Sequence, residues 1–179
     1  MTLDRPISTP QLTLVSLSTG HAAGPYLVWM NDVEVMKYLE SRDRAYRRSD
    51  LETYIEDCNS DPAVLLLGLF DRCDGVHVGN IKLGPVEARH RRGDVGLVIG
   101  DKTKWGRGLA REAIVGITDH AFAALDLAKV TAGCYGSNVG SVRAFLAAGW
   151  HEEARRRRHC LCDGKWEDVI MLARFRDDA

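Results

Sequence analysis

The sequence predicts one domain built around a mixed α/β sheet. Two observations lead to this prediction. The chain has 179 residues, 45% hydrophobic and 27% charged, which is the size and composition of a single soluble globular domain with its own core. The spacing of apolar residues also changes along the chain, from strand-length runs to a long helical pattern after Gly108. The resulting order is one strand, helices, three strands, helix, strand, helix and two strands.

The first predicted elements are a strand and three helices. Residues 12–18 have the pattern of a strand, and the segment 24–40 has helical apolar spacing with a break at Asn31-Asp32, which predicts two short helices. Ser49 followed by Glu52 is the pattern of a capping box. We therefore expect a third helix from about Asp50 to Cys58.

Three consecutive strands are expected in the middle of the chain. The apolar run 63–71 and the segment 75–86 flank an Asp74-Gly75 turn signal, which predicts a hairpin. Residues 93–100 form the third strand of this group. Gly96 lies inside that strand and is a candidate for a β-bulge.

The last part of the chain predicts a long helix, a strand, a shorter helix and a final hairpin. Apolar residues recur every three or four positions over 108–125, as in an amphipathic helix. Residues 129–135 form the next strand, and residues 152–162 and 167–175 form the last two, joined at Asp163-Gly164.

The shorter helix has recognisable ends. Ser137 or Asn138 can cap its N-terminus, and Gly149 is placed to end it. We expect its inner face to carry Val139, Val142, Phe145 and Leu146.

Charge and composition exclude several classes of protein. The formal net charge is −1, so no overall field attracts nucleic acid or a membrane surface. The sequence has neither an N-terminal apolar segment nor an 18-residue apolar run. Five cysteines, an odd number without a secretory signal, favour reduced thiols over a disulfide framework. We therefore expect a cytoplasmic protein without nucleic-acid or membrane partners.

The segment 99–114, IGDKTKWGRGLAREAI, places Gly106 and Gly108 between a strand and a helix. Glycines there can simply turn the chain. They can also let a phosphate approach the unpaired N–H groups of the first helical turn, with Arg107 adding charge. Both readings stay open on this motif alone. A Rossmann loop is disfavoured, because Arg111 occupies the sixth position of its glycine pattern and the preceding strands form a largely antiparallel meander.

Two motifs resemble those of the Gcn5-related N-acetyltransferases, the GNAT superfamily, in the branch of the Rim-type ribosomal-protein acetyltransferases. The acetyl-CoA loop of that family reads Q/R-x-x-G-x-G/A. The corresponding residues here, with tryptophan at the Gln/Arg position, are Trp105, Gly106, Arg107, Gly108, Leu109 and Ala110. The second family motif reads N-x-x-S/A-x-x-x-Y-x-x-x-G-F. Its counterparts are Asn138, Ser141, Phe145, Gly149 and Trp150.

The resemblance covers nearly the whole chain and implies one acetyltransferase domain over residues 1–179. It implies a mostly antiparallel central sheet of about seven strands, flanked by helices and splayed between Leu97–Ile99 and Thr131–Cys134. Acetyl-CoA is the implied cosubstrate, with no metal. Its pyrophosphate would bind the backbone N–H groups of residues 105–110, and its pantetheine arm would run beside Leu97, Val98 and Ile99. Asn138 and Ser141 would complete the cofactor site.

Transfer of an acetyl group to an amine requires a base, because a primary amine with a pKa of about 10 is protonated at neutral pH. The resemblance points first to Asp94, at the start of the central strand. A structural role for Asp94, capping a turn or pairing with Arg91 or Arg92, is the alternative. Glu87 and His90 are further candidates, in a loop that could face the acceptor.

The tetrahedral oxyanion needs a donor, and a backbone N–H in the strand Leu97–Ile99 is the candidate. Many family members place a tyrosine, as general acid, at the position of Phe145, on a helix face expected to look toward the thioester sulfur. Phenylalanine cannot donate a proton. Ser141 and Tyr135 are the remaining nearby hydroxyls, and protonation by solvent is a third option. Glu112, in a first helical turn, is expected to be structural.

Two other features carry less weight. Cys160 and Cys162 with His159 suggest a metal site only weakly, because the sequence has no second pair at zinc spacing. We therefore expect no metal site. Arg155–Arg158 alternate across a predicted strand, so two arginines could face an acceptor phosphate or a partner chain. A solvated edge strand is the default interpretation.

The acceptor is predicted from a looser resemblance. The segments 29–43 and 79–108 are similar to sugar-modifying acetyltransferases of surface-polysaccharide and flagellin-glycan pathways. This implies a small-molecule acceptor, the amino group of a nucleotide-linked deoxysugar. A protein N-terminus is the alternative acceptor, and a homodimer is a further expectation. Because Phe145 replaces the usual tyrosine, a non-catalytic acetyl-CoA-binding module is the alternative of a different class.

Overall fold

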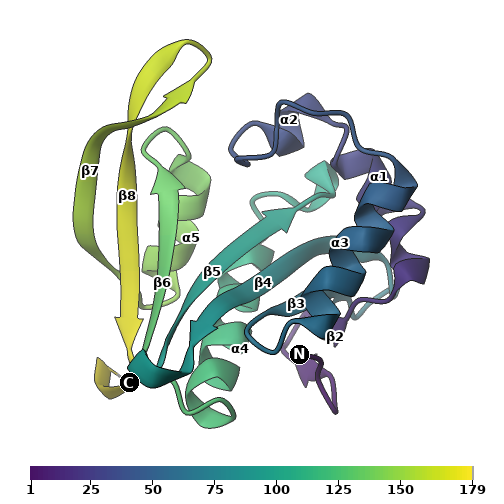
Figure 1. Ribbon diagram of the computed structural model, residues 1–179, viewed down its shortest axis with the longest axis horizontal. Helices are drawn as coiled ribbons and strands as arrows, with labels where there is room; N and C mark the ends of the chain where they lie inside the picture. Colours follow the sequence, from purple (N-terminus) through teal and green to yellow (C-terminus); the bar gives the residue numbers. More distant parts are fainter. Residues whose placement is uncertain (179) are drawn as a thin grey trace.

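The computed structural model describes residues 1–178 and leaves Ala179, the last residue of the predicted domain, outside the description. These residues contain one eight-stranded sheet, in the order β1-β2-β3-β4-β5-β6-β8-β7 (Figure 1). Its strands are β1 Ile7–Ser8, β2 Leu12–Ser16, β3 Leu65–Asp71, β4 His77–Glu87, β5 Arg92–Ile99, β6 Lys129–Tyr135, β7 His151–Cys162 and β8 Lys165–Phe175.

Helices cover both faces of this sheet. The α-helices are α1 Pro25–Trp29, α2 Val33–Met36, α3 Arg48–Ser60, α4 Leu109–Ala123 and α5 Val139–Ala147. Helices α1 to α3 lie on one face, over the N-terminal strands, and α4 and α5 lie on the other (Figure 1). Short 3₁₀ turns are η1 Thr19–Ala22, η2 Ala88–His90, η3 Lys102–Lys104 and η4 Arg176–Asp178. The prediction of a mixed α/β fold is therefore confirmed.

Strands β5 and β6 form the one parallel pair within the described sheet, and they pair only briefly. Their register runs from Arg92↔Lys129 to Asp94↔Thr131, which is three residue pairs. Beyond Asp94 and Thr131 the strands diverge, as Figure 1 shows. We call this opening the fork, its last pair the vertex and its open end the mouth. The predicted splay of the sheet is confirmed.

The five helices and seven of the strands match the predicted elements, and the differences are local. The additional strand is β1, where Ile7 pairs with Leu14, and two residues are too short to give a periodic pattern. The third helix begins at Arg48, so the expected cap at Ser49 is wrong. Instead, the Asp50 side chain accepts a hydrogen bond of 2.7 Å from the Arg47 backbone N–H, which satisfies the first free amide.

The predicted bulge at Gly96 is also wrong. Gly96 pairs regularly with Lys82, and the irregularity lies in β4, where Gly84 and Pro85 together face Asp94. Proline has no N–H to donate to the ladder, so the extra residue is accommodated there. The bulge marks the position on β5 at which the fork begins.

Helix α5 has the predicted ends but a narrower buried face. Asn138 is its N-cap, and Gly149, with φ +85°, follows its C-terminus as expected. Phe145 is 1% exposed, whereas Val139 and Leu146 are 49% and 46% exposed. A helix of nine residues buries only a narrow stripe, so the inner face is confirmed at Phe145 and wrong at the two exposed residues.

Candidate active site

The two faces of β5 beyond the vertex have different neighbours. Leu97 and Ile99 pack against the hydrophobic cluster under α4 and α5. Val98 packs against the separate cluster under α1 to α3. Because alternate residues of a strand share a face, Asp94 and Gly96 lie on the same side as Val98. The fork therefore presents Asp94 to the α1–α3 face of the sheet.

The β5 backbone also alternates, and this decides which residues can pair with a ligand. The Gly100 N–H donates to the Val78 carbonyl at 2.9 Å, so even-numbered positions near it face β4. The backbone groups of Leu97 and Ile99 therefore point into the fork. Among the three residues predicted to line the pantetheine arm, Leu97 and Ile99 keep that prediction, whereas Val98 uses its backbone within the sheet.

Trp105 reaches back to this strand. Its indole N–H donates to the Ile99 carbonyl at 2.7 Å, which fixes the loop between β5 and α4 against the fork. Tryptophan at the usual Gln/Arg position of the motif thus has a structural explanation.

The N-terminus of α4 is open. Gly106 and Gly108 have φ angles of +73° and +82°, and a β-carbon built on either would meet no described atom within 4 Å. Gly108 is the N-cap residue and has no side chain to bond the first-turn amides, including those of Leu109 and Ala110. Such amides carry partial positive charge and bind anions. The geometry fits the predicted phosphate site.

The basic side chains of this loop differ in whether they form ion pairs. Lys104 forms an ion pair with Asp71 at 2.5 Å, and Lys102 forms one with Asp32 at 2.7 Å. Arg107 forms no salt bridge with any residue in 1–178, so its guanidinium is available to an anion beside the glycines.

The N-terminus of α5, on the other side of the fork, is capped. The Asn138 side-chain oxygen accepts a hydrogen bond of 3.2 Å from the Ser141 N–H. The Ser141 hydroxyl lies 3.3 Å from the Cys134 sulfur, and burial raises the pKa of that thiol. Asn138 and Ser141, which were predicted to complete the cofactor site, thus lie beside β6 and make hydrogen bonds within the protein.

Asp94 occupies the vertex. Its side chain is exposed, and its Oδ1 accepts a hydrogen bond from the Thr131 hydroxyl across the last parallel pair. Arg91 pairs with Asp126 at 2.9 Å and Arg92 with Glu87 at 2.7 Å, so neither arginine neutralises Asp94. The second carboxylate oxygen of Asp94 remains free of ion pairs in the described chain.

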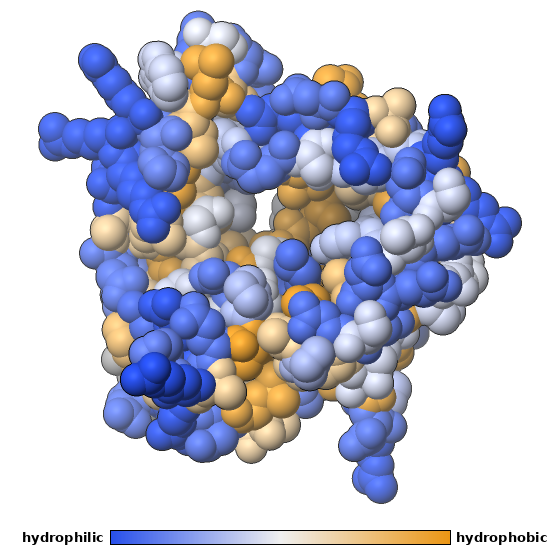
Figure 2. All heavy atoms as spheres, in the orientation of Figure 1, coloured by the Kyte–Doolittle hydropathy of each residue, from blue (hydrophilic) through white to orange (hydrophobic). Residues whose placement is uncertain are grey.

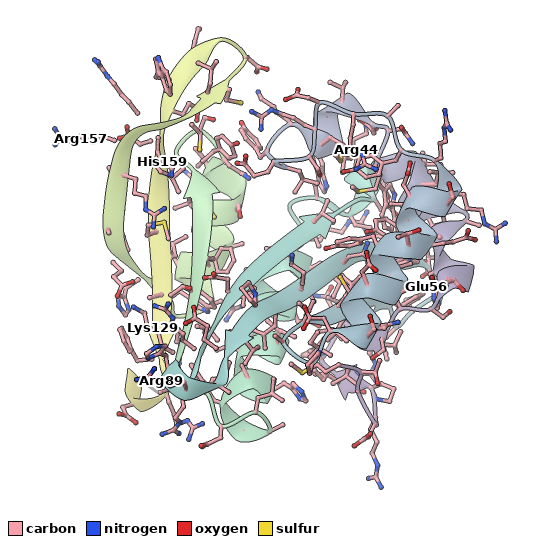
Figure 3. All side chains as sticks on the ribbon, viewed as in Figure 1. Arg44, Glu56, Arg89, Lys129, Arg157 and His159 are labelled. Carbon is pink, nitrogen blue, oxygen red and sulfur yellow. The ribbon has the colours of Figure 1, made fainter. Side chains whose placement is uncertain are left out.

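Glu87 and His90 lie elsewhere. They belong to the turn between β4 and β5, before the strands reach the vertex, and Figure 3 shows the neighbouring Arg89 near Lys129 at the foot of the sheet. From His90 to Leu97 the chain advances seven residues at about 3.3 Å each. The expectation that this loop faces the acceptor is therefore wrong, because the turn lies at the closed end of the fork.

Glu112 is structural, as predicted, with different partners. Its carboxylate accepts hydrogen bonds from Thr9, from the Gln11 backbone and side chain, and from the Leu12 N–H. Partial burial raises the pKa of Glu112, but these hydrogen bonds outweigh it and lower the pKa overall. The residue holds the β1–β2 turn against α4.

The Tyr135 hydroxyl is hydrogen-bonded to two side chains of the chain segment 40–42. It donates to Glu40 at 2.5 Å and accepts from Arg42 at 2.9 Å. Burial and the hydrogen bond to Glu40 raise the pKa of Tyr135 to about 12. These two bonds give the Tyr135 hydroxyl a structural role, and its catalytic role stays a prediction.

Phe145 does not face the fork either. Its ring packs 4.7 Å from the Trp150 ring, within the cluster under α4 and α5. The expectation that this helix face looks toward the thioester sulfur is wrong for Phe145, because the aromatic pair anchors α5 to the core. Ser141, Tyr135 and solvent stay the predicted acids.

The mouth of the fork is closed by a segment that the sequence did not indicate. We call residues 32–42, which include α2, the bridge. On the β5 side, Asp32 and Glu34 bind Lys102 at 2.7 and 3.0 Å. On the β6 side, Tyr38 donates to the Ser137 carbonyl at 3.2 Å. Figure 2 shows the molecule hollowed at this place, with atoms surrounding the opening on all sides.

The arginine run lies on the edge strand β7, and the two nearby cysteines lie at the end of that strand, where the Cys162 sulfur is 4.0 Å from the Lys37 carbonyl of the bridge. Three residues of β7 between Arg156 and Cys160 face one residue of β8, and Arg157 points away from the molecule (Figure 3). The expected alternation of arginines is therefore interrupted by this irregularity. Within residues 1–178 no three His, Cys, Asp or Glu side chains gather as metal ligands, and none of the helices there is long and apolar enough to span a membrane.

Comparisons with known proteins identify acetyltransferases. The family model of the acetyltransferase (GNAT) domain matches residues 11–151. The probable N-acetyltransferase YjcK of Bacillus subtilis is 31% identical over 112 residues, which cover 62% of this chain and 61% of YjcK. The matched part thus spans about three fifths of that relative.

Two solved structures share the fold. Spermidine N-acetyltransferase from Vibrio cholerae, in complex with CoA and spermine, superposes with a TM-score of 0.83 at 22% identity, covering 94% of this chain and 97% of that one. Ribosomal-protein-S5-alanine acetyltransferase from Vibrio fischeri superposes with a TM-score of 0.84 at 17% identity, covering 98% of both.

Proposed function

This chain belongs to the GNAT family of acetyltransferases, and from that premise we propose that it transfers the acetyl group of acetyl-CoA to a primary amine inside the fork. One observation carries the proposal. The open N-terminus of α4, with Gly106 and Gly108 facing empty space, lies at the end of the same strand on which the Leu97 backbone groups and the Ile99 N–H point into the fork.

The residues present fit acetyl-CoA. The first-turn amides of α4 and the Arg107 guanidinium suit the pyrophosphate. The backbone groups of Leu97 and Ile99 suit an amide-containing arm, which would add to β5 as a strand would. The V. cholerae relative, which was solved with CoA, supports the same assignment.

The chemistry follows from the vertex. Asp94 takes the proton from the acceptor ammonium, so that the neutral amine can attack the thioester carbonyl. The Leu97 N–H, which points into the fork, stabilises the oxyanion. The attacking nitrogen then releases its second proton to solvent as the carbon–sulfur bond breaks, and coenzyme A leaves as a thiolate. Solvent returns its proton, with Ser141 as the alternative donor.

The acceptor is a small-molecule amine, most specifically the amino group of a nucleotide-linked sugar, as the sequence resemblance implies. A protein N-terminus is the second candidate, favoured by the structural likeness to the S5-alanine acetyltransferase. A polyamine is added to the acceptors to be tested because of the likeness to spermidine N-acetyltransferase. The alternative of another class is a non-catalytic module that binds acetyl-CoA. It is favoured by Phe145, which replaces the usual tyrosine.

One assay separates these candidates. The protein is incubated with acetyl-CoA and UDP- or dTDP-linked amino sugars, spermidine, or N-terminal peptides, and thiol release is followed together with product mass. We expect turnover with the amino sugars. Turnover with peptides or spermidine alone would replace the acceptor assignment. Binding of acetyl-CoA without turnover of any amine would favour the binding module.

Three broader expectations accompany this function. The whole chain, residues 1–179, acts as one catalytic domain, which is supported by a single buried cluster containing both Leu12 and Leu172. A cytoplasmic location is supported by five cysteines that are all unpaired thiols. A homodimer stays a prediction, and sedimentation of the purified protein tests it.

A further inference from the structure

The two halves of the sheet are held together differently at the two ends of the fork. At the vertex, backbone pairing ends with Asp94 and Thr131. At the mouth, within the described residues, β5 and β6 share no backbone ladder, and the bridge spans the gap instead. The fork is therefore a closed ring of protein and not an open groove.

The bridge is attached firmly on the β5 side. Lys102, just after β5, binds both Asp32 and Glu34. Trp29, at the end of the preceding helix, packs so closely on Gly100 that a β-carbon there would collide with its ring. This side of the ring combines two ion pairs with tight packing, so it is anchored redundantly.

On the β6 side, Tyr38 donates to the Ser137 carbonyl, and two further contacts of the bridge share the Tyr135 hydroxyl. Tyr135 donates to Glu40 at 2.5 Å and accepts from Arg42 at 2.9 Å, so both bridge residues converge on it. Arg42 also donates to the Leu161 carbonyl at 2.7 Å and stacks its guanidinium 5.4 Å from the Tyr135 ring centre. We call Tyr135, Glu40 and Arg42 the latch.

The ring encloses the α1–α3 approach to Asp94. Two residues between the vertex and the mouth on this face, Gly96 of β5 and Gly133 of β6, have no side chain, and both are exposed. A β-carbon at Gly96 would meet no described atom within 4 Å. A molecule that reaches the Asp94 carboxylate from this face therefore passes between two glycine-lined strands and under the bridge (Figure 2).

We propose that the latch of Tyr135, Glu40 and Arg42 holds the bridge as the acceptor-side wall of the reaction site and thereby determines acceptor affinity and selectivity. This rests on the proposed function. The three residues are positioning residues, because they bond to one another and to the backbone, and they act on the acceptor through the bridge. Acetyl-CoA would be held by Gly106, Gly108 and the first-turn amides of α4, none of which belongs to the bridge.

The test is Tyr135→Phe, which removes the hydroxyl and keeps the ring. We expect KM for the acceptor to rise about tenfold, as the loss of two hydrogen bonds to the bridge allows, with KM for acetyl-CoA and kcat within twofold of the parent protein. Selectivity should also relax, so that the ratio of kcat/KM for n-butylamine over cyclohexylmethylamine falls toward one.

Two further variants make the result specific. Glu40→Gln keeps an oxygen that accepts from Tyr135, so it should stay near the parent values, whereas Glu40→Ala should behave like Tyr135→Phe. Tyr54→Phe is the matched control, because Tyr54 lies on α3 and its hydroxyl makes no hydrogen bond to a bridge residue in the described structure. It should change neither KM by more than twofold.

The outcomes separate this inference from the function on which it rests. A parent protein that binds acetyl-CoA but acetylates no amine contradicts the proposed function. A parent protein that turns over, with an unchanged acceptor KM and unchanged amine ratio in Tyr135→Phe and Glu40→Ala, contradicts the latch alone. Equal rises in both KM values would also contradict it, because a general loss of structure would affect both substrates.

Discussion

The two strands of the fork each lead into a helix, and the two helices begin in opposite ways. Strand β5 leads to α4, which starts at Gly108 with φ +82° and with open space around its first amides. Strand β6 leads to α5, which starts at Asn138, whose side chain accepts a hydrogen bond from the Ser141 N–H. Within the described residues, no side chain caps the first helix end, whereas a side chain caps the second.

This difference separates a binding side from a supporting side. A side-chain cap typically stabilises a helix by about 1 kcal/mol, so α4 forgoes that stabilisation where an anion can supply it. The β5 side also carries Asp94 and the Leu97 backbone groups that point into the fork. The β6 side carries Phe145, which packs in the core, and Tyr135, which holds the bridge. The predictions below test this division.

The largest effect is expected at the vertex. Asp94→Asn should lower kcat/KM by roughly 10²–10⁴-fold while the affinity for acetyl-CoA stays largely intact, because the amide cannot accept the proton. Steady-state kinetics and calorimetry measure the two quantities. Glu87→Gln, at the closed end, is the control and should be nearly silent. Near-normal turnover with reduced thermal stability would make Asp94 structural.

The next effect concerns the open helix end. Gly108→Val should weaken acetyl-CoA binding by at least about 100-fold, because a branched side chain would fill the space beside the α4 amides. A branched residue at positive φ also costs roughly 1–2 kcal/mol of stability. Gly164→Val, at φ +73° in the open β7–β8 turn, is a control with matched strain and should bind normally. Unchanged affinity in folded Gly108→Val would refute the phosphate site.

A smaller effect is expected for the residue at the usual tyrosine position. Phe145→Tyr should lower the free energy of unfolding by about 1–3 kcal/mol, because it buries a hydroxyl beside Trp150, and kcat should not rise. Urea unfolding and kcat measured below pH 8.5 check this. A rise in kcat in that pH range would show that the hydroxyl reaches the thiolate, contrary to the packing seen here.

Removal of the side-chain cap of α5 should lower the stability of the protein without weakening acetyl-CoA binding. Asn138→Ala should cost about 1 kcal/mol of unfolding free energy, the usual value of an N-cap, and leave acetyl-CoA affinity within threefold. Denaturant titration with and without acetyl-CoA measures both. A tenfold loss of affinity at unchanged stability would instead place Asn138 among the cofactor ligands, as the family resemblance implies.

The smallest effect is expected at Ser141. Its hydroxyl already contacts the Cys134 sulfur, so Ser141→Ala should change kcat by less than about threefold if solvent protonates the thiolate. A drop of a hundredfold or more with acetyl-CoA binding preserved would assign Ser141 as the acid and give the β6 side a catalytic role.

The sequence by itself determined the helices, seven of the eight strands and the glycine loop between β5 and α4. These features have local causes: apolar periodicity, Asn138 and Gly149 at the ends of α5, and glycines placed where a helix begins. The identity of Asp94 as a candidate base came from the family resemblance, which implies an acidic residue at the start of the central strand. Such signals lie within a few residues of one another and can be read along the chain.

The tertiary structure alone decided which of these residues meet. Tyr135 and Glu40 are 95 residues apart, and no local pattern indicates that the α2 segment crosses the mouth of the fork. The same holds for the burial of Phe145 and for Glu87 at the closed end, since each depends on where the strands part. Long-range contacts arise from the packing of whole elements. The residue type and its spacing can therefore predict which reaction a side chain could perform, but they do not predict which distant residue it contacts in the folded protein.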